Sequence, residues 1–214
     1  TNAGNANAFT GRSGDEEIST YRSAFAAALG LKEDQILIAS TGVIGEPLNG
    51  RTIAGFAEQL SKHIGTASWY DAALAIRTTD TFAKGSSKSL ILGGQRVTIN
   101  GIAKGSGMIA PDMATMLAYI ATDAAIAPAC LQQMLEKAVS ASFNAITVDS
   151  DTSTSDSVYL LATHKVNHQQ ITNINSAPGE AVYKALEEVM IDLAKQIVKD
   201  GEGARKFITV RVSA

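Results

Sequence analysis

Segments with helical and strand-like patterns alternate along the whole chain, and this alternation limits the possible folds more than any other feature. Apolar residues at three- and four-residue steps predict helices over residues 15–29, 49–64, 70–77, 128–142 and 181–199. Short apolar runs predict strands over residues 35–39, 116–122 and 206–212, with two more strands, or a strand and a short helix, over 145–148 and 157–162. Residues 89–102 read as two or three strands, broken at the turn pairs Gly93-Gly94 and Asn100-Gly101. These strands are too short and mixed for a doubly wound sheet, so we expect a layered α/β or α+β architecture.

Composition excludes several classes of protein. Hydrophobic residues make up 45% of the 214 residues and the net charge is -3, which excludes a mainly disordered chain. The slight acidity, with a pI of about 5.6, argues against a nucleic-acid-binding surface. No apolar run approaches the roughly 18 residues of a membrane span. The single cysteine, Cys130, excludes an internal disulfide and fits a reducing compartment such as the cytoplasm.

The two ends are unusual for a whole natural protein. The chain begins with Thr1 rather than Met, and it ends directly after a strand-like run. The first residues lack the basic and apolar regions of a signal peptide. We expect both ends to be cut from a longer protein, although a whole domain that has lost its Met would have the same composition.

An acidic run follows the segment 145–148. Asp149 and Asp151 are spaced like the first ligands of a calcium loop, but Thr154 and Leu160 stand where such a loop needs Gly and Glu. Ser153 departs from the pattern of the haloacid-dehalogenase phosphatases, whose first Asp is a nucleophile. The favoured interpretation is a turn whose side chains bond nearby backbone groups, and no metal site is predicted.

Single histidines and the cysteine offer little chemistry. His164 and His168 are four residues apart, but no carboxylate between them completes a metal-ligand pattern, so surface positions are expected. Cys130 stands among apolar residues of a predicted helix, which favours core packing.

Two glycine-rich segments are better candidates for a catalytic role. Residues 40–47 leave a predicted strand, and their glycines allow backbone N–H groups to form an oxyanion hole. Residues 101–111 lack the Gly-Lys-Ser/Thr of a P-loop and lead to Ala114 and Thr115. Cleavage before Thr115 would free an α-amine, of ordinary pKa about 7.7 to 8.0, that can act as the base for the threonine hydroxyl. An Ala-Thr pair is common, so spacing alone leaves self-cleavage as one hypothesis among several.

Six segments, in order along almost the whole chain, match one known family. They are NANA from residue 5, STGVIGEPL from 40, TTDTF from 78, GIAKGSGMIAPDMATMLAYIATDA from 101, SFNAITVDSDTSTSD from 142 and DGEGARKF from 200. Together they resemble the bifunctional ornithine acetyltransferase family, the glutamate N-acetyltransferases of arginine biosynthesis. The block over 101–124 is specific by itself. The acidic run is then a family feature rather than a phosphatase site.

The resemblance implies a layered α/β sandwich of the type shared with self-cleaving peptidases. Residues 1–214 would be one partial catalytic domain, cut between Ala114 and Thr115 into α and β segments. The implied site residues are the nucleophile Thr115, the oxyanion-hole pair Thr41 and Gly42, and the substrate-binding residues Thr78, Lys104, Thr115 and Glu202. Family chains are considerably longer and supply further substrate-binding residues, so these residues alone are not expected to complete the site.

The implied reaction is a ping-pong acetyl transfer. N-acetylornithine acetylates the Thr115 hydroxyl, ornithine leaves, and glutamate takes the acetyl group; some members also accept acetyl-coenzyme A. Lys104 would offer a cation to the substrate carboxylate and Glu202 a carboxylate to a substrate amine, so we expect the Lys104 ammonium to face the site rather than solvent. The α and β segments would form an α2β2 heterotetramer, and no metal or organic cofactor is implied.

Two other interpretations stay open. A self-cleaving amidohydrolase or peptidase with an N-terminal threonine would use the same nucleophile, but it should lack the pairing of Lys104 with Glu202. A non-catalytic fragment or uncleaved precursor of the acetyltransferase would serve only as a folded domain.

Overall fold

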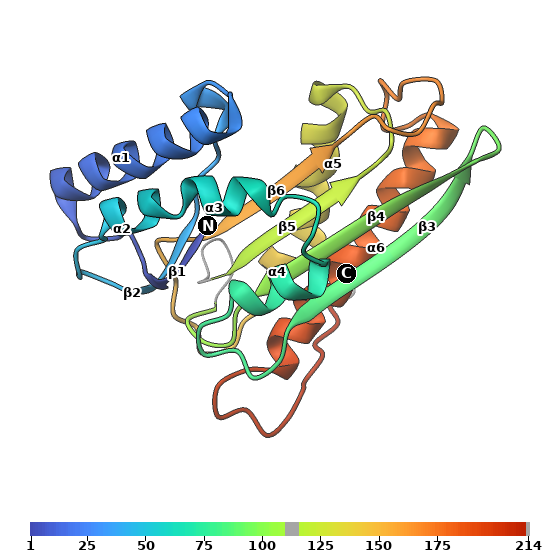
Figure 1. Cartoon of the computed structure of the whole chain (residues 1–214). Helices are drawn as coiled ribbons and strands as arrows, with labels where there is room; N and C mark the ends of the chain where they lie inside the picture. Colours follow the sequence, from blue (N-terminus) through green and yellow to red (C-terminus); the bar gives the residue numbers. More distant parts are fainter. Residues whose placement is uncertain (110–115, 213–214) are drawn as a thin grey trace. The chain divides into compact units, whose positions relative to one another are not determined.

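The structure, a computed structural model, describes residues 1–109 and 116–212 of the chain (Figure 1). Ala114 and Thr115, the predicted cleavage site, therefore lie outside the described residues. The chain divides into two compact units, Thr1–Thr78 and Thr79–Ala214. Each unit has its own strands and helices.

The first unit combines a pair of parallel strands with short and long helices (Figure 1). Its elements are β1 (Asn2–Asn5), α1 (Gly11–Leu29), the 3-10 helix η1 (Glu33–Gln35), β2 (Ser40–Val43), α2 (Gly50–Gly55), α3 (Ala57–Lys62) and α4 (Trp69–Ala75). Helix α1 confirms the helix predicted over 15–29. It ends at Gly30, whose φ of 65° is the left-handed conformation that closes many helices.

Two predictions for the first unit are wrong. Residues 35–39 contain no strand; β2 begins only at Ser40, because the short partner strand β1 pairs Asn2 with Ser40 and Asn5 with Val43. The single helix predicted over 49–64 is two helices, α2 and α3, which are separated after Gly55. The break occurs there because glycine has a low helix propensity, and Phe56 is both the last flanking residue of α2 and the first of α3.

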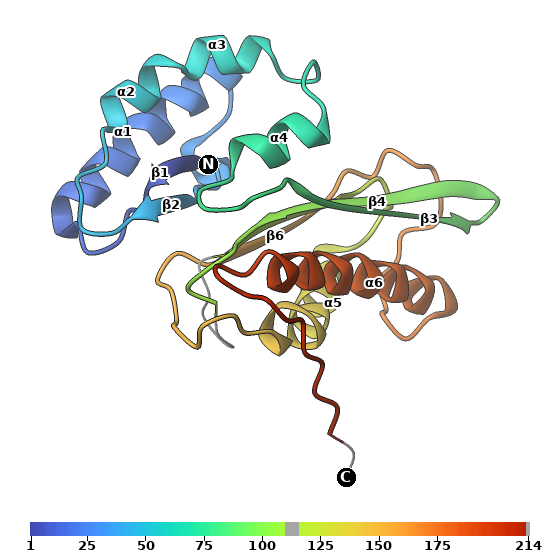
Figure 2. The ribbon, with the colours of Figure 1, turned by 90° about the horizontal axis from the view of Figure 1, so that it is seen from below.

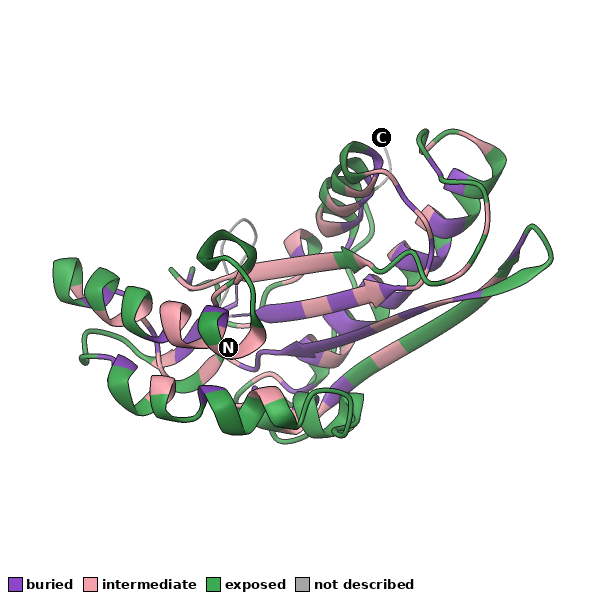
Figure 3. Cartoon of the chain, turned by 45° about the horizontal axis from the view of Figure 1, so that its top comes forward, coloured by how far each residue is buried: buried purple, intermediate pink, exposed green. Residues whose placement is uncertain are grey.

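The second unit is a four-stranded sheet with two helices on one face (Figure 2). Its elements are β3 (Lys84–Leu92), β4 (Gln95–Lys104), β5 (Leu117–Thr122), α5 (Pro128–Ala141), the 3-10 helix η2 (Phe143–Ala145), β6 (Ser157–Ala162) and α6 (Ala177–Lys199). The strand order is β3-β4-β5-β6, with antiparallel pairing except between β5 and β6, which run parallel. The central strands β4 and β5 are the most deeply buried (Figure 3).

Most predictions for the second unit are confirmed. The strands over 116–122 and 157–162 and the helices over 128–142 and 181–199 are present, and Gly93-Gly94 forms the turn between β3 and β4. Helix α6 begins earlier than predicted, at Ala177, because the Ser176 hydroxyl accepts the Gly179 N–H and caps it. Cys130 is 2% exposed and packs in the core as expected. The core side chains between sheet and helices include Val97, Ile99, Ile120, Met134, Leu186 and Leu193.

Other predictions for this unit are wrong. Asn100-Gly101 is not a turn but part of β4, and Gly101 is needed there because α6 packs closely on the sheet. A Cβ at Gly101 would lie 2.9 Å from Leu193 Cδ1 and 3.1 Å from Val189 Cγ1. The strand predicted over 206–212 is not formed. Residues 145–148, predicted as a strand or a short helix, contain only the last residue of the 3-10 helix η2. Neither segment has a strand partner in the described part of the chain.

The expected mixed α/β architecture is confirmed, because helices α5 and α6 bury their apolar sides against the sheet of the second unit. Within the two described ranges, every helix is too short or too polar to cross a membrane.

Two buried salt bridges of one lysine connect the segment before β3 with the end of α6. The Lys84 side chain is fully buried, and its Nζ lies 2.7 Å from Asp80 Oδ1 and 2.5 Å from Asp200 Oδ2. Asp200 directly follows α6, where the negative end of the helix dipole disfavours an acid. Burial would raise the pKa of Asp200, but hydrogen bonds from Lys84 and Thr81 lower it below its ordinary value. The positive charge of Lys84 thus compensates the negative charges of Asp80 and Asp200, which are far apart from each other in the sequence.

Replacing Lys84 should destabilise the second unit strongly. Lys84→Met leaves two buried carboxylates without their cation, and we expect the free energy of unfolding to fall by about 3–5 kcal/mol in urea denaturation. The control Lys88→Met, on the same strand, breaks an exposed ion pair with Glu188 and should cost about 1 kcal/mol or less. Equal losses in the two variants would contradict a special role for the buried bridge.

Enlarging Gly101 should separate α6 from the sheet. Gly101→Val places side-chain atoms where Leu193 and Val189 already pack, and we expect a loss of about 1–3 kcal/mol of unfolding free energy. Gly85 is exposed on the edge strand β3, and a Cβ there meets only a backbone oxygen at 3.8 Å. The control Gly85→Val should therefore stay near wild type in the same denaturation experiment. A stable Gly101→Val protein would show that the close approach of α6 is dispensable.

Candidate active site

Lys104 ends strand β4 and is buried, with 2% of its surface exposed. Gly101 faces α6, so the alternation of side chains along a strand places Lys104 on the opposite face of the sheet. Lys104 is therefore shielded from solvent. Its role toward Thr115 stays a prediction.

Lys104 lies in the field of several charged groups. Burial lowers the pKa of Lys104 below its ordinary value, and the Lys84 ammonium acts in the same direction. The carboxylates that oppose this shift are Asp80, Asp156 and Glu202. These carboxylates favour the charged ammonium, which is the form that can bind an anionic group of a ligand.

Glu202 lies in the loop that follows α6 and contacts the glycine-rich segment after β4. Its backbone N–H donates to the Ser106 carbonyl at 2.8 Å. Its carboxylate lies against Gly107, where a Cβ would be 2.9 Å from Glu202 Cδ. The absence of a side chain at residue 107 therefore makes the room that the Glu202 carboxylate occupies. The structure thus brings Glu202 and Lys104, two predicted substrate-binding residues, into one region.

Asp80 holds the start of the glycine-rich segment in place. Its Oδ1 accepts both the Lys84 ammonium and the Gly105 N–H, each at 2.7 Å. Ser106 Oγ lies 3.3 Å from Thr79 Oγ1. Segments near residues 80, 105 and 202 therefore meet, although they are far apart in sequence.

The network of Asp80, Lys84 and Asp200 that supports this region could not be predicted from the sequence. Asp80 and Asp200 stand inside two of the matching segments, but no pattern in those segments indicates a role for either residue. Lys84 lies outside those segments and nothing in the sequence marked it. A lysine in a strand that is otherwise rich in Ser and Gly resembles an exposed residue until its partners are known.

The acidic run over 149–153 forms the expected turn with bonds to nearby backbone. The Asp151 N–H donates to Asp149 Oδ1 at 3.2 Å, and the Ser155 N–H donates to Ser153 Oγ at 3.2 Å. Asp149 also reaches a distant segment, because its carboxylate accepts the N–H groups of Met108 at 2.5 Å and Ile109 at 3.0 Å. The turn is therefore more than a local structure.

Asp156 lies just before β6 and was not singled out in the sequence. Its Oδ1 accepts the Met116 N–H at 2.9 Å. Burial raises the pKa of Asp156 to about 7, against the opposing effects of the Met116 hydrogen bond and the Lys104 ammonium. Asp156 is thus a carboxyl group that can change its charge near neutral pH, next to the residue that follows Thr115 in sequence.

The predicted oxyanion-hole pair lies on β2 of the first unit. Thr41 is fully buried, and it pairs with Ala3 of β1. Gly42 has a φ of 128°, and a Cβ there would lie 2.2 Å from the Gly4 carbonyl oxygen. Only glycine therefore fits at residue 42.

The predicted site residues are divided between the two units. Thr78 is the last residue of the first unit, which also holds Thr41 and Gly42, whereas Lys104 and Glu202 belong to the second unit. The grouping of these residues around one nucleophile stays a prediction.

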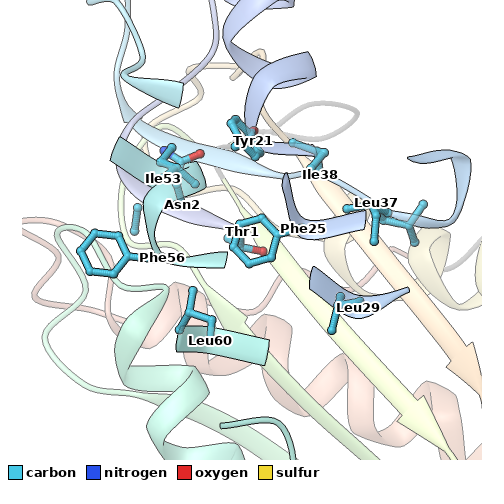
Figure 4. A pocket seen from close by; sticks show the side chains of 12 residues that line it. Thr1, Asn2, Tyr21, Phe25, Leu29, Leu37, Ile38, Ile53, Phe56 and Leu60 are labelled. Carbon is cyan, nitrogen blue, oxygen red and sulfur yellow. The ribbon is translucent and has the colours of Figure 1, made fainter. Parts of the chain in front are cut away.

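A cavity of about 440 Å3 in the first unit is a poor candidate for the active site (Figure 4). None of the predicted site residues lines it. The labelled side chains around it are mainly apolar and come from the start of the chain, from α1, from the segment before β2 and from the α2–α3 region, with Phe25, Ile38 and Leu60 among them. The polar residues of this lining are Thr1, Asn2 and Tyr21, and none of them belongs to the predicted site.

Comparisons with known proteins agree with the sequence resemblance. The model of the ArgJ family matches residues 1–214. The arginine biosynthesis bifunctional protein ArgJ of Bartonella henselae is 51% identical over 211 residues, which cover 99% of this chain and 52% of that protein. The protein of the same name from Rhizobium meliloti is 49% identical over 214 residues, again covering 99% and 52%. The chain thus spans about half the length of the curated relatives it matches.

A solved structure is also similar. The crystal structure of arginine biosynthesis bifunctional protein ArgJ from Bacillus halodurans is 38% identical, with a TM-score of 0.46, and the match covers 52% of this chain and 58% of that one. Since the family model matches residues 1–214 in full, the chain belongs to the ArgJ family.

Proposed function

We propose that the protein containing this chain transfers the acetyl group of N-acetylornithine to glutamate. The observation that carries the proposal is the placement of the buried Lys104 ammonium and the Glu202 carboxylate in one region. N-acetylornithine has a carboxylate and a free side-chain amine, so a cation and an anion recognise its two charged groups. The names of the relatives, arginine biosynthesis bifunctional proteins, support the same reaction.

The proposed reaction begins with self-cleavage. The Thr115 hydroxyl attacks the carbonyl carbon of Ala114, the bond from that carbon to the Thr115 nitrogen breaks, and the hydroxyl proton moves to the nitrogen. Water then hydrolyses the resulting ester, which gives the Ala114 carboxylate and frees the Thr115 hydroxyl beside its own α-amine.

Acetyl transfer then takes two steps. The Thr115 α-amine takes the hydroxyl proton while the oxygen attacks the acetyl carbonyl of N-acetylornithine, and the proton passes to the α-amine of the departing ornithine. The neutral α-amine of glutamate next attacks the acetyl ester, and its proton returns to the Thr115 oxygen as N-acetylglutamate leaves. Thr41 and Gly42 stabilise the negatively charged oxygen in both steps.

The proposal includes the assembly of the protein. The two units act as one catalytic domain, and the segments before and after the cleaved bond remain together as an α2β2 heterotetramer in the cytoplasm. Acetyl-coenzyme A serves as a second acetyl donor. The pairing of Lys104 with Glu202 favours a transferase over an amidohydrolase or peptidase, because hydrolysis at Thr115 does not need groups that bind both charges of an amino acid.

Removing the Thr115 hydroxyl should abolish both reactions. In the protein at its natural length, Thr115→Ala should give one uncleaved chain by intact mass and no acetyl transfer from N-acetylornithine to glutamate, because the hydroxyl is the attacking group in both. Thr115→Ser keeps a hydroxyl and should retain part of each activity. Normal cleavage of the Ala variant would disprove the assignment of the nucleophile.

Removing the Lys104 ammonium should weaken substrate binding. Lys104→Met should raise the KM for N-acetylornithine by about 10- to 100-fold, since a hydrogen bond to a charged group is worth about 1.5–3 kcal/mol. Lys104→Arg should recover only part of this loss, because its charge is restored but its shape differs. Lys165→Met, which removes an exposed lysine, is the control and should leave the KM unchanged. A KM within twofold of wild type in Lys104→Met would remove this residue from the binding site.

A further inference from the structure

The acidic turn holds the chain on both sides of the predicted cleavage site. On the N-terminal side of the cleavage site, called the near flank here, the Asp149 carboxylate accepts the N–H of Met108 on Oδ2 and the N–H of Ile109 on Oδ1. On the C-terminal side, called the far flank, Asp156 Oδ1 accepts the N–H of Met116. Each carboxylate therefore holds one flank of residues 110–115.

Neighbouring groups of the turn strengthen both contacts. The carbonyl oxygen of Ile109 accepts the Val148 N–H and the Thr147 hydroxyl, each at 2.8 Å. The Ser157 N–H donates to the Met116 carbonyl at 3.1 Å. Backbone N–H and carbonyl groups on both flanks are thus hydrogen-bonded to residues of one short stretch, 147–157. These bonds fix the two flanks relative to each other.

Backbone conformation gives a second, independent sign that the near flank is held. Met108 has a φ of 56°, in the left-handed region that side-chain-bearing residues adopt at a cost. Such a conformation persists where surrounding bonds impose it. The bond from the Met108 N–H to Asp149 is one such bond.

We infer that Asp149 and Asp156 are positioning residues for self-cleavage, because they hold Met108, Ile109 and Met116, the described residues on either side of the segment that contains the bond before Thr115. The inference rests on the proposed function, because it takes cleavage before Thr115 as the reaction. The covalent steps are those given above, and the two carboxylates neither gain nor lose an atom in them.

The two carboxylates differ in charge at neutral pH. Burial alone would raise the pKa of Asp149, but hydrogen bonds from the backbone of Met108, Asp151 and Ile109 lower it, so Asp149 is ionised. Asp156, with a pKa of about 7, becomes ionised as the pH rises through neutrality, and among the described residues the Lys104 ammonium of β4 favours its charged form. An ionised acceptor makes a hydrogen bond roughly twice as strong, so the hold on Met116 tightens over this pH range.

Asp149→Asn tests the near flank. Asparagine has one acceptor oxygen where three N–H groups, those of Met108, Ile109 and Asp151, donate to the two oxygens of Asp149, and its amide NH2 would face at least one of these donors. We expect cleavage to slow by about tenfold or more, as for the loss of a hydrogen bond to a charged group. The full-length protein is labelled in a short pulse of cell-free synthesis, and its conversion to two pieces is followed during the chase. Asp151→Asn, an exposed acid in the same turn, is the matched control and should cleave at the wild-type rate.

Asp156→Asn tests the far flank by its pH profile. Asparagine keeps an acceptor for the Met116 N–H but has no charge, so the rise in cleavage rate around pH 7 should disappear from chases at pH 6, 7 and 8. The variant should also melt no lower than wild type at pH 8. The folded-state pKa of Asp156 lies above its ordinary 3.8, so this carboxyl makes stability fall as pH rises from about 4 to 7.

The outcomes separate this inference from the proposed function. Wild-type cleavage in Asp149→Asn, or a wild-type pH profile in Asp156→Asn, overturns the positioning role and leaves the nucleophile assignment intact. Cleavage of Thr115→Ala overturns the proposed function, whatever the two aspartate variants do. A lower melting temperature of Asp156→Asn with an unchanged pH profile would show a structural carboxyl and likewise overturns the inference.

Discussion

The Lys84 ammonium, buried between Asp80 and Asp200, is the interaction on which the second unit depends most. Two carboxylates without a cation would be very costly in this position, so the segment before β3, the strand itself and the end of α6 must come together. Asp80 then fixes Gly105, and the chain after Asp200 brings Glu202 against Gly107. A charge balance in the interior thereby shapes the region where substrate binding is proposed.

Strand β4 serves the core and the candidate site at the same time. Its residues Val97, Ile99 and Gly101 face the helices, and the missing side chain at Gly101 lets α6 approach. The alternation of side chains then turns Lys104 to the other face of the sheet. A shift of register by one residue would exchange these two sets, so close packing of α6 also fixes the direction of the Lys104 ammonium.

The acidic turn shows how a local motif acquires a distant role. Its internal bonds are those that Asp, Ser and Thr make in many turns, and they leave the Asp149 carboxylate free to accept further donors. The parallel pairing of β5 with β6 brings this turn to the start of β5, where Met116 lies. Sheet topology therefore decides which backbone groups Asp149 and Asp156 contact.

Much of the fold was determined by the sequence itself. The periodic apolar stripes of α1, α5 and α6 and the glycine turn between β3 and β4 were predicted correctly, because helical period and turn chemistry are local properties. The six matching segments likewise identified the family. They also led to Lys104 and Glu202, whose substrate-binding role stays a prediction. Only the tertiary structure decided that residues 35–39 and 206–212 form no strand and that Asn100-Gly101 lies within β4, since strands depend on partners. It alone revealed Lys84, Asp149 and Asp156 as bound groups, because burial and long-range hydrogen bonds arise only when distant segments meet.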